Sequence, residues 1–264
     1  MRKFTAVLYD SMLEIMHRKM LYLYAAVTVL ITLIFLLVPS VSIDGRSIID
    51  NNPTAQSFAT TLIAQLFSKY MGFAMFLMVF GAAGLLPSYL NKGRIELNLS
   101  KPISRIKLLL MKFSSVYLIM IAVMTLMCLP LWLVLSFRLD GPIWSFFPGL
   151  LVAFIEFLVI YSIVFILGLL SNSTAVAIIG YFALSIVTGL LAKREFVYNF
   201  LGKAWQVSFD TIYNILPKMD QISDNIVSLI LSSGLANFYA IWSSVLFAAV
   251  MILVSILVFR KTDY

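Results

Sequence analysis

Residues able to carry covalent or metal chemistry are scarce in this chain of 264 residues. It holds one histidine, His17, and one cysteine, Cys128. These numbers argue against zinc sites built from histidine and cysteine clusters, haem held by two histidines, Ser-His-Asp or Cys-His catalysis, and an intrachain disulfide. No segment reads G-x-x-x-x-G-K-[ST], so the chain lacks the phosphate-binding loop of an ATPase. We expect no catalytic residue, no metal site and no cofactor of its own.

A single acidic residue interrupts one of the long apolar stretches. Glu156 lies near the middle of residues 146–170, and burying it ionised in a membrane is costly. We expect its carboxyl group to face away from lipid and to be protonated or hydrogen-bonded. Two roles remain open: a polar point or proton site on a translocation pathway, or a hydrogen bond that fixes one helix to its neighbour.

The composition places the elements that carry these residues in a membrane. Hydrophobic residues make up 62% of the chain and charged residues 12%, and the mean hydropathy is +1.01. Soluble domains average about 45–50% apolar and about 25% charged residues, so this chain has too little polar surface to cover a soluble core. The sequence therefore predicts an all-α integral membrane protein.

Long apolar windows define the expected spans. A transmembrane helix needs about 20 mostly apolar residues, and six windows qualify: 20–38, 70–90, 113–136, 146–170, 174–191 and 238–259. Six spans place both termini on one side, which then holds twelve lysines and arginines against four acidic residues, while the other side holds seven of each. The positive-inside rule places both termini in the cytoplasm. Because this bias accounts for most of the basic excess, we expect no nucleic-acid partner.

Residues 1–19 predict an interfacial helix before the first span. Its apolar residues recur at helical spacing on one face, and polar residues occupy the rest. The predicted apolar face consists of Phe4, Val7, Leu8, Met12 and Ile15. Two readings stay open: a helix that only lies among lipid headgroups, and a helix that also contacts a cytoplasmic partner.

Two longer segments join the spans of what we expect to be one domain, residues 1–264. Residues 192–237 contain an amphipathic stretch and a second apolar stretch, 226–231, that is too short to span, and they predict short outer or re-entrant helices before the last span. Residues 91–112 form the one substantial cytoplasmic loop, which is basic and in which Pro102 can start a short helix. Two interpretations stay open: the basic residues only mark a cytoplasmic loop, or the alternation of apolar and charged residues marks a docking surface.

That loop carries a family resemblance. It is similar to the loop after the second span in the permeases of type-2 ABC exporters, most of all the six-span permeases that pair with a separate ATPase, including those near genes for copper-enzyme maturation. The matching positions are Gly93, Arg94, Glu96, Ser100, Pro102, Ser104 and Arg105, with Lys112 downstream. The resemblance extends over essentially the whole chain. One departure is Tyr89, which stands where the family often has an acid.

The resemblance implies a function for these segments. In the family this loop forms a coupling helix that sits in a groove of the ATPase, the N-terminal helix lies beside it, and two permeases form the pathway. For this chain it implies an ABC exporter permease in a bacterial inner membrane, with a cytoplasmic ABC ATPase, a second copy of itself and membrane lipid as partners. ATP and Mg²⁺ are then bound by the ATPase. Pro217 and Asp220 fall in the outer gate region.

Two other classes of function remain open. A secondary transporter or channel would use Glu156 as a proton or ion site, although the chain has no internal repeat and no second charge predicted deep in a span to pair with it. A non-transporting membrane anchor is consistent with the same residues. The sequence does not identify the transported substrate.

Overall fold

The computed structural model describes residues 2–37, 42–43, 46–47, 53–90, 104–138, 142–194 and 203–261. Apart from one hairpin, in which β1 (Ser42–Ile43) pairs antiparallel with β2 (Arg46–Ser47), these residues form helices and their connections. The helices are α1 (Arg2–His17), α2 (Met20–Leu37), α3 (Pro53–Ala83), α4 (Leu85–Tyr89), α6 (Arg105–Arg138), α7 (Phe146–Ser171), α8 (Thr174–Ala192), α10 (Lys203–Ile215), α11 (Met219–Ile230) and α12 (Phe238–Lys261).

Several of these helices are long and apolar enough to cross a membrane. Within the described residues, five qualify on their own: Thr61–Tyr89, Arg105–Phe137, Phe146–Ser171, Thr174–Ala192 and Phe238–Lys261. A sixth is obtained when α1 and α2 are taken together as one bent pair. The prediction of an all-helical chain of the multi-pass membrane type is therefore confirmed, with five to six such helices rather than six separate ones.

Two helices begin well before the apolar windows predicted from sequence. Helix α3 starts at Pro53 instead of residue 70, so it includes Lys69, and α6 starts at Arg105 instead of residue 113. Residues 105–112 of the predicted loop 91–112 are thus helical. A window of hydropathy marks only the apolar part of a helix, whereas α6 has 34 residues and a length of about 50 Å, longer than the roughly 30 Å of hydrocarbon in a bilayer.

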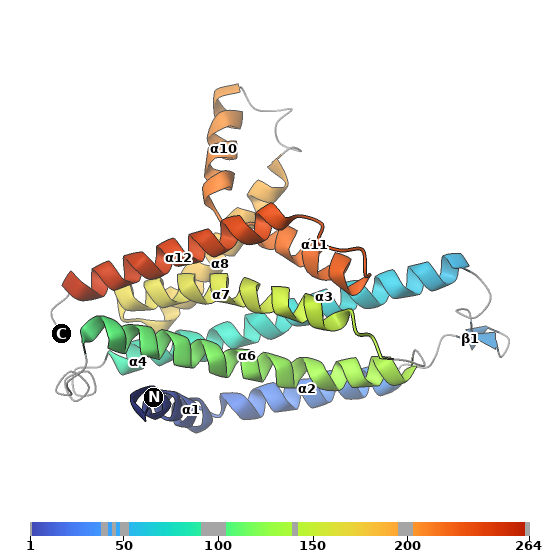
Figure 1. Ribbon diagram of the computed structural model, residues 1–264, viewed down its shortest axis with the longest axis horizontal. Coiled ribbons are helices and arrows are strands. Elements are labelled where there is room, and N and C mark those ends of the chain that lie inside the picture. The colour runs from blue at the N-terminus through green and yellow to red at the C-terminus, as the bar shows by residue number, and fades with distance from the viewer. Residues whose placement is uncertain are drawn as a thin grey trace.

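Helix α7 occupies the centre of the bundle (Figure 1). It packs against α12, α11, α8, α3 and α6, and 72% of its apolar window is buried, compared with 22% for α8 and for α12. Its last residue is followed by Asn172 in the left-handed conformation, with φ of 50°, and the Asn172 amide donates to the Gly168 carbonyl at 3.0 Å. Asparagine tolerates this conformation better than most residues, which explains the sharp return into α8.

We call the end of the bundle at which α1 lies and α12 finishes the terminal end, and the opposite end, near the β1–β2 hairpin, the far end (Figure 1). Helix α1 does not continue α2 but bends from it by 66° at Arg18 and Lys19, and Lys19 has a positive φ of 58°. Helices α1 and α2 are therefore not collinear, and α1 lies at the terminal end (Figure 1). Helix α10 stands away from the bundle and contacts α8.

Candidate functional site

A buried lysine on α6 ties α1 to the bundle. Lys112 is 0% exposed, and its ammonium group donates to Ser11 Oγ at 3.0 Å and to Glu14 Oε2 at 3.5 Å. It also lies 3.8 Å from Asp10 Oδ2 and 4.9 Å from the centre of the Tyr89 ring. A lysine is almost never fully buried without such partners, because a desolvated ammonium is costly. The position of α1 is thus set by its polar side chains as well as by its apolar ones.

The Glu14 carboxylate also links α1 to α4. The Arg18 Nη2 atom donates to Glu14 Oε1 at 3.1 Å and to the Gly84 carbonyl at 2.9 Å, and the Ser88 hydroxyl donates to Glu14. A Cβ atom at Gly84 would overlap the Arg18 guanidinium, so the absence of a side chain there permits this contact. We name Asp10, Ser11, Glu14, Arg18, Ser88 and Lys112 the anchor cluster.

The anchor cluster has members before and after residues 91–103, which hold five of the seven predicted coupling positions, and its Lys112 is the last residue of the predicted loop 91–112. Helix α4 ends at Tyr89 and α6 begins at Arg105, so the two helices to which α1 is bound are those that precede and follow residues 91–103. Charged groups that are paired and mostly buried hold a specific geometry, because separating them leaves an unpaired buried charge. A displacement of either helix is therefore expected to carry α1 with it.

Part of this site was not predicted from the sequence. Ser11 was not among the residues of the predicted apolar face of the first helix, yet it is 0% exposed. Ser11 faces α6 because its hydroxyl meets Ser115 Oγ at 3.3 Å as well as the Lys112 ammonium. One signal was available: Lys112 stands alone in a run of apolar residues, where a lysine needs a partner.

Most of the predicted coupling positions lie outside the described residues. These are Gly93, Arg94, Glu96, Ser100 and Pro102. The remaining two, Ser104 and Arg105, are adjacent in the chain at the start of α6. The Ser104 hydroxyl accepts a hydrogen bond from the Lys107 amide at 3.4 Å, in the pattern of a helix N-cap, and Arg105 is exposed.

Glu156 lies where three helices meet. The residue is 7% exposed on α7, and Ser223 of α11 donates to its Oε1 atom at 3.4 Å. Asp220 at the start of α11 and Tyr181 on α8 are within electrostatic reach of its carboxyl group. The carboxyl group is thus turned away from lipid and has a hydroxyl partner on a neighbouring helix. This geometry is compatible with both roles left open by the sequence.

The segment predicted as an outer gate forms a buried turn between α10 and α11. Pro217 and Lys218 are buried, Asp220 is exposed, and the Lys218 amide donates to Ser244 Oγ on α12 at 3.0 Å. The Lys218 ammonium lies 4.8 Å from the Tyr239 ring centre, and burial together with nearby Arg194 lowers the pKa of Lys218.

Helix α11 is joined to the start of α12 by paired amide groups. Asn225 donates to the Asn237 carbonyl at 2.8 Å and accepts from the Asn237 amide at 2.7 Å, while the Asn237 side chain accepts from the Ala240 amide at 3.3 Å. Asn237 therefore caps α12 and fixes α11 against it. The predicted short helices of residues 192–237 are present, but α11 begins at Met219, earlier than the apolar stretch 226–231 indicated.

Among the described residues, no group of three or more histidine, cysteine, aspartate or glutamate side chains is placed to hold a metal ion.

Similarity to known proteins is limited to one family. No curated protein and no solved structure matches the chain. A family model with the description "Protein of unknown function (DUF2705)" matches residues 44–264, which include every helix from α3 to α12 and therefore Lys112 and Glu156. The chain belongs to the DUF2705 family.

Proposed function

We propose that this protein is the membrane-spanning permease subunit of an ATP-binding-cassette exporter. In this proposal two copies form the translocation pathway in a bacterial inner membrane, both termini are cytoplasmic, and a separate cytoplasmic ATPase binds ATP and Mg²⁺. The observation that carries the proposal is the anchor cluster, which joins α1 to α4 and α6 on the two sides of residues 91–103.

The physical argument concerns the transfer of force. An ATPase that closes on ATP moves its docked surface as a rigid body, and a permease responds only if the contacted segment is firmly attached to its spans. Here α6 begins directly after the proposed coupling segment and continues for 34 residues, so a push at Arg105 acts on a whole span. The contact between Lys112 and Glu14 would transmit a displacement of α6 to α1. The bend after α1 would then transmit it to α2.

The arrangement of the last helices is consistent with an exporter of this kind. Helices α10 and α11 are short and amphipathic, and α11 packs against α7 and α3 before α12 leaves for the terminal end. In this proposal α11 is the gate, because it is too short to cross a membrane itself. It is held against the spans by buried Ile222, Ile226 and Ile230 and by the Ser223–Glu156 hydrogen bond. Peripheral helices α8 and α12 expose apolar side chains that a second copy or lipid would cover.

Arg105→Glu tests the coupling. Arg105 is exposed, so the substitution should leave the thermal unfolding temperature of the purified chain unchanged. Reversing a charge at a docked surface should lower the ATP hydrolysis that the permease stimulates in the purified complex at least about tenfold, since a like-charge contact costs several kcal/mol. Arg260→Glu, at an exposed position at the end of α12, is the matched control and should retain stimulation. Full stimulation in Arg105→Glu would refute the proposed coupling.

A second candidate function rests on Glu156. Its buried carboxyl group and the Ser223 hydroxyl on the short helix α11 would suit an ATP-independent transporter that moves a proton or ion. That function predicts flux in vesicles containing this chain alone, and loss of the flux in Glu156→Gln. Under the exporter proposal, vesicles without the ATPase should be inactive, and the Glu156→Gln complex should still hydrolyse ATP. A non-transporting anchor would tolerate both Glu156→Gln and Arg105→Glu as long as its complex assembled.

A further inference from the structure

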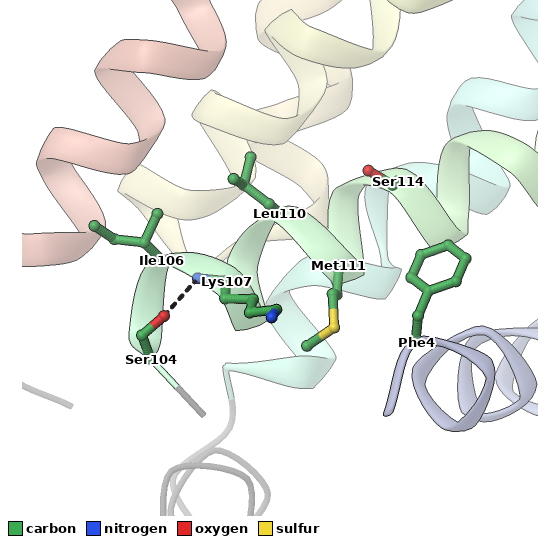
Figure 2. A pocket seen from close by; sticks show the side chains of 7 residues that line it. All are labelled: Phe4, Ser104, Ile106, Lys107, Leu110, Met111 and Ser114. Carbon is green, nitrogen blue, oxygen red and sulfur yellow. Dashed lines mark hydrogen bonds between the residues drawn. The ribbon is translucent and has the colours of Figure 1, made fainter. Parts of the chain in front are cut away.

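An open groove of about 440 Å³ lies at the terminal end between α1 and the first turns of α6 (Figure 2). Its apolar lining comes from Ile106, Leu110 and Met111 of α6 and from Phe4 of α1. Ser104 and Lys107 line the same groove at the start of α6, next to the hydrogen bond that caps the helix. None of the residues that line the groove belongs to the anchor cluster.

Along α6 the lining begins with Ser104, Ile106 and Lys107, continues with Leu110 and Met111, and ends at Ser114. Ser104 and Lys107 belong to the cap and the first turn, and Leu110 lies about 9 Å further along the helix axis than Ser104. From its first residues α6 continues into the bundle as one of the candidate spans, while α1 lies across its start. The charged end of the groove is therefore at the start of α6, and Leu110 and Met111 follow it before the Ser114 hydroxyl. A phospholipid with its phosphate at the charged end would place an acyl chain against these two apolar residues.

The charge of the groove selects the headgroup. Lys107 is the one charged side chain among the described residues that line it, and no carboxylate is present in this lining. Basic residues near a membrane surface attract anionic lipid by about 1 kcal/mol each. A zwitterionic headgroup gains less from the same site because its own cation opposes Lys107.

We propose that this groove binds one anionic phospholipid. Its phosphate lies against the Lys107 ammonium, with the Ser104 hydroxyl beside it, and an acyl chain covers Leu110, Met111 and Phe4. Because Phe4 belongs to α1 and the other residues to α6, the lipid would hold the start of α1 against α6. The proposal requires only that the chain is a multi-pass membrane protein, and does not depend on the exporter function.

Lipid titration of the purified full-length chain in mild detergent tests the proposal. Dioleoylphosphatidylglycerol should raise the unfolding temperature at lower concentration than dioleoylphosphatidylcholine, and native mass spectrometry should detect one tightly retained anionic lipid per chain. Lys107→Gln should weaken phosphatidylglycerol binding about fivefold, and Lys107→Arg should restore it. Lys261→Gln, at an exposed position at the end of α12, removes the same charge outside the groove and should bind like the wild type.

Two further measurements separate the lipid from other occupants. Glycerol 3-phosphate carries the headgroup charge without acyl chains and should give no stabilisation, whereas Leu110→Trp, which fills the apolar part of the groove, should reduce lipid binding while keeping Lys107. Equal binding of the two lipids, or unchanged phosphatidylglycerol affinity in Lys107→Gln, would refute the proposal. If Lys107→Gln instead released a protein partner while lipid binding stayed intact, the groove would belong to that partner.

Discussion

Lys112→Met should detach α1 from the bundle and lower the stability of the protein by about 3 kcal/mol. Removing one partner of a buried ion pair costs roughly 3–5 kcal/mol. The lower end applies here because Asp10 is 46% exposed and Glu14 keeps its contacts with Arg18 and Ser88. The unfolding temperature in detergent should fall, and protease should cut the connection between α1 and α2 faster than in the wild type. Under the exporter proposal, stimulated ATP hydrolysis should also be lost.

Lys69→Met is the matched control, because Lys69 is exposed on α3 and the substitution is the same. A double variant, Lys112→Met with Glu14→Gln, keeps the experiment informative if the single variant folds poorly. It removes both charges, so its loss of stability should be smaller than the sum of the two single losses by at least about 1 kcal/mol. Additive losses would mean that the Lys112–Glu14 contact does not hold α1 in place.

Gly149→Leu should separate α11 from α7 and disturb the contacts around Glu156. A Cβ atom at Gly149 would lie 3.1 Å from Ile230 Cγ1 and 3.4 Å from the Ile226 carbonyl oxygen, and a leucine adds three more carbons to that space. A backbone carbonyl cannot rotate away, so α11 must move, at a cost of about 1–3 kcal/mol. The shift should break the hydrogen bond from Ser145 to the Ile230 carbonyl, which is 2.7 Å long.

Hydrogen exchange of the α11 amides measures this displacement directly. Exchange across residues 219–230 should accelerate in Gly149→Leu while α6 and α7 remain protected. Gly72→Leu is the control, since no atom lies within 4 Å of a Cβ placed there, and it should leave α11 unchanged. If transport depends on α11 as a gate, Gly149→Leu should abolish it, whereas normal exchange and normal transport would show that α11 does not depend on this close contact.

Local sequence signals predicted the elements of this fold well. Helix α2 spans Met20–Leu37 where residues 20–38 were expected, and α7 and α8 end or begin at the predicted polar break around Asn172. Apolar length and turn residues are properties of neighbouring positions, so they can be read without knowing what lies alongside. The early start of α3 also had a local signal, because proline is favoured at the first position of a helix, as at Pro53.

Contacts between distant segments left no such signal. Lys112 pairs with Glu14, 98 positions away in the chain, and Ser223 donates to Glu156 across 67 positions. The periodicity of the first helix did not place Ser11 on its apolar face, and the polar partners on α6 bury that residue nonetheless. A hydrophobic pattern shows which face of a helix is apolar on average. It does not show that a hydroxyl on one helix will be buried against a lysine on another.

The sequence by itself determined that this protein is all-helical and of the multi-pass membrane type, because the length and apolarity of each helix are local quantities set by the thickness of a bilayer. The tertiary structure alone decided that α1 is bound to α4 and α6, that Glu156 meets a hydroxyl of α11, and that a groove with one lysine opens beside α1. These features depend on pairs of side chains brought together by packing, whose energy exists only once both helices are in place.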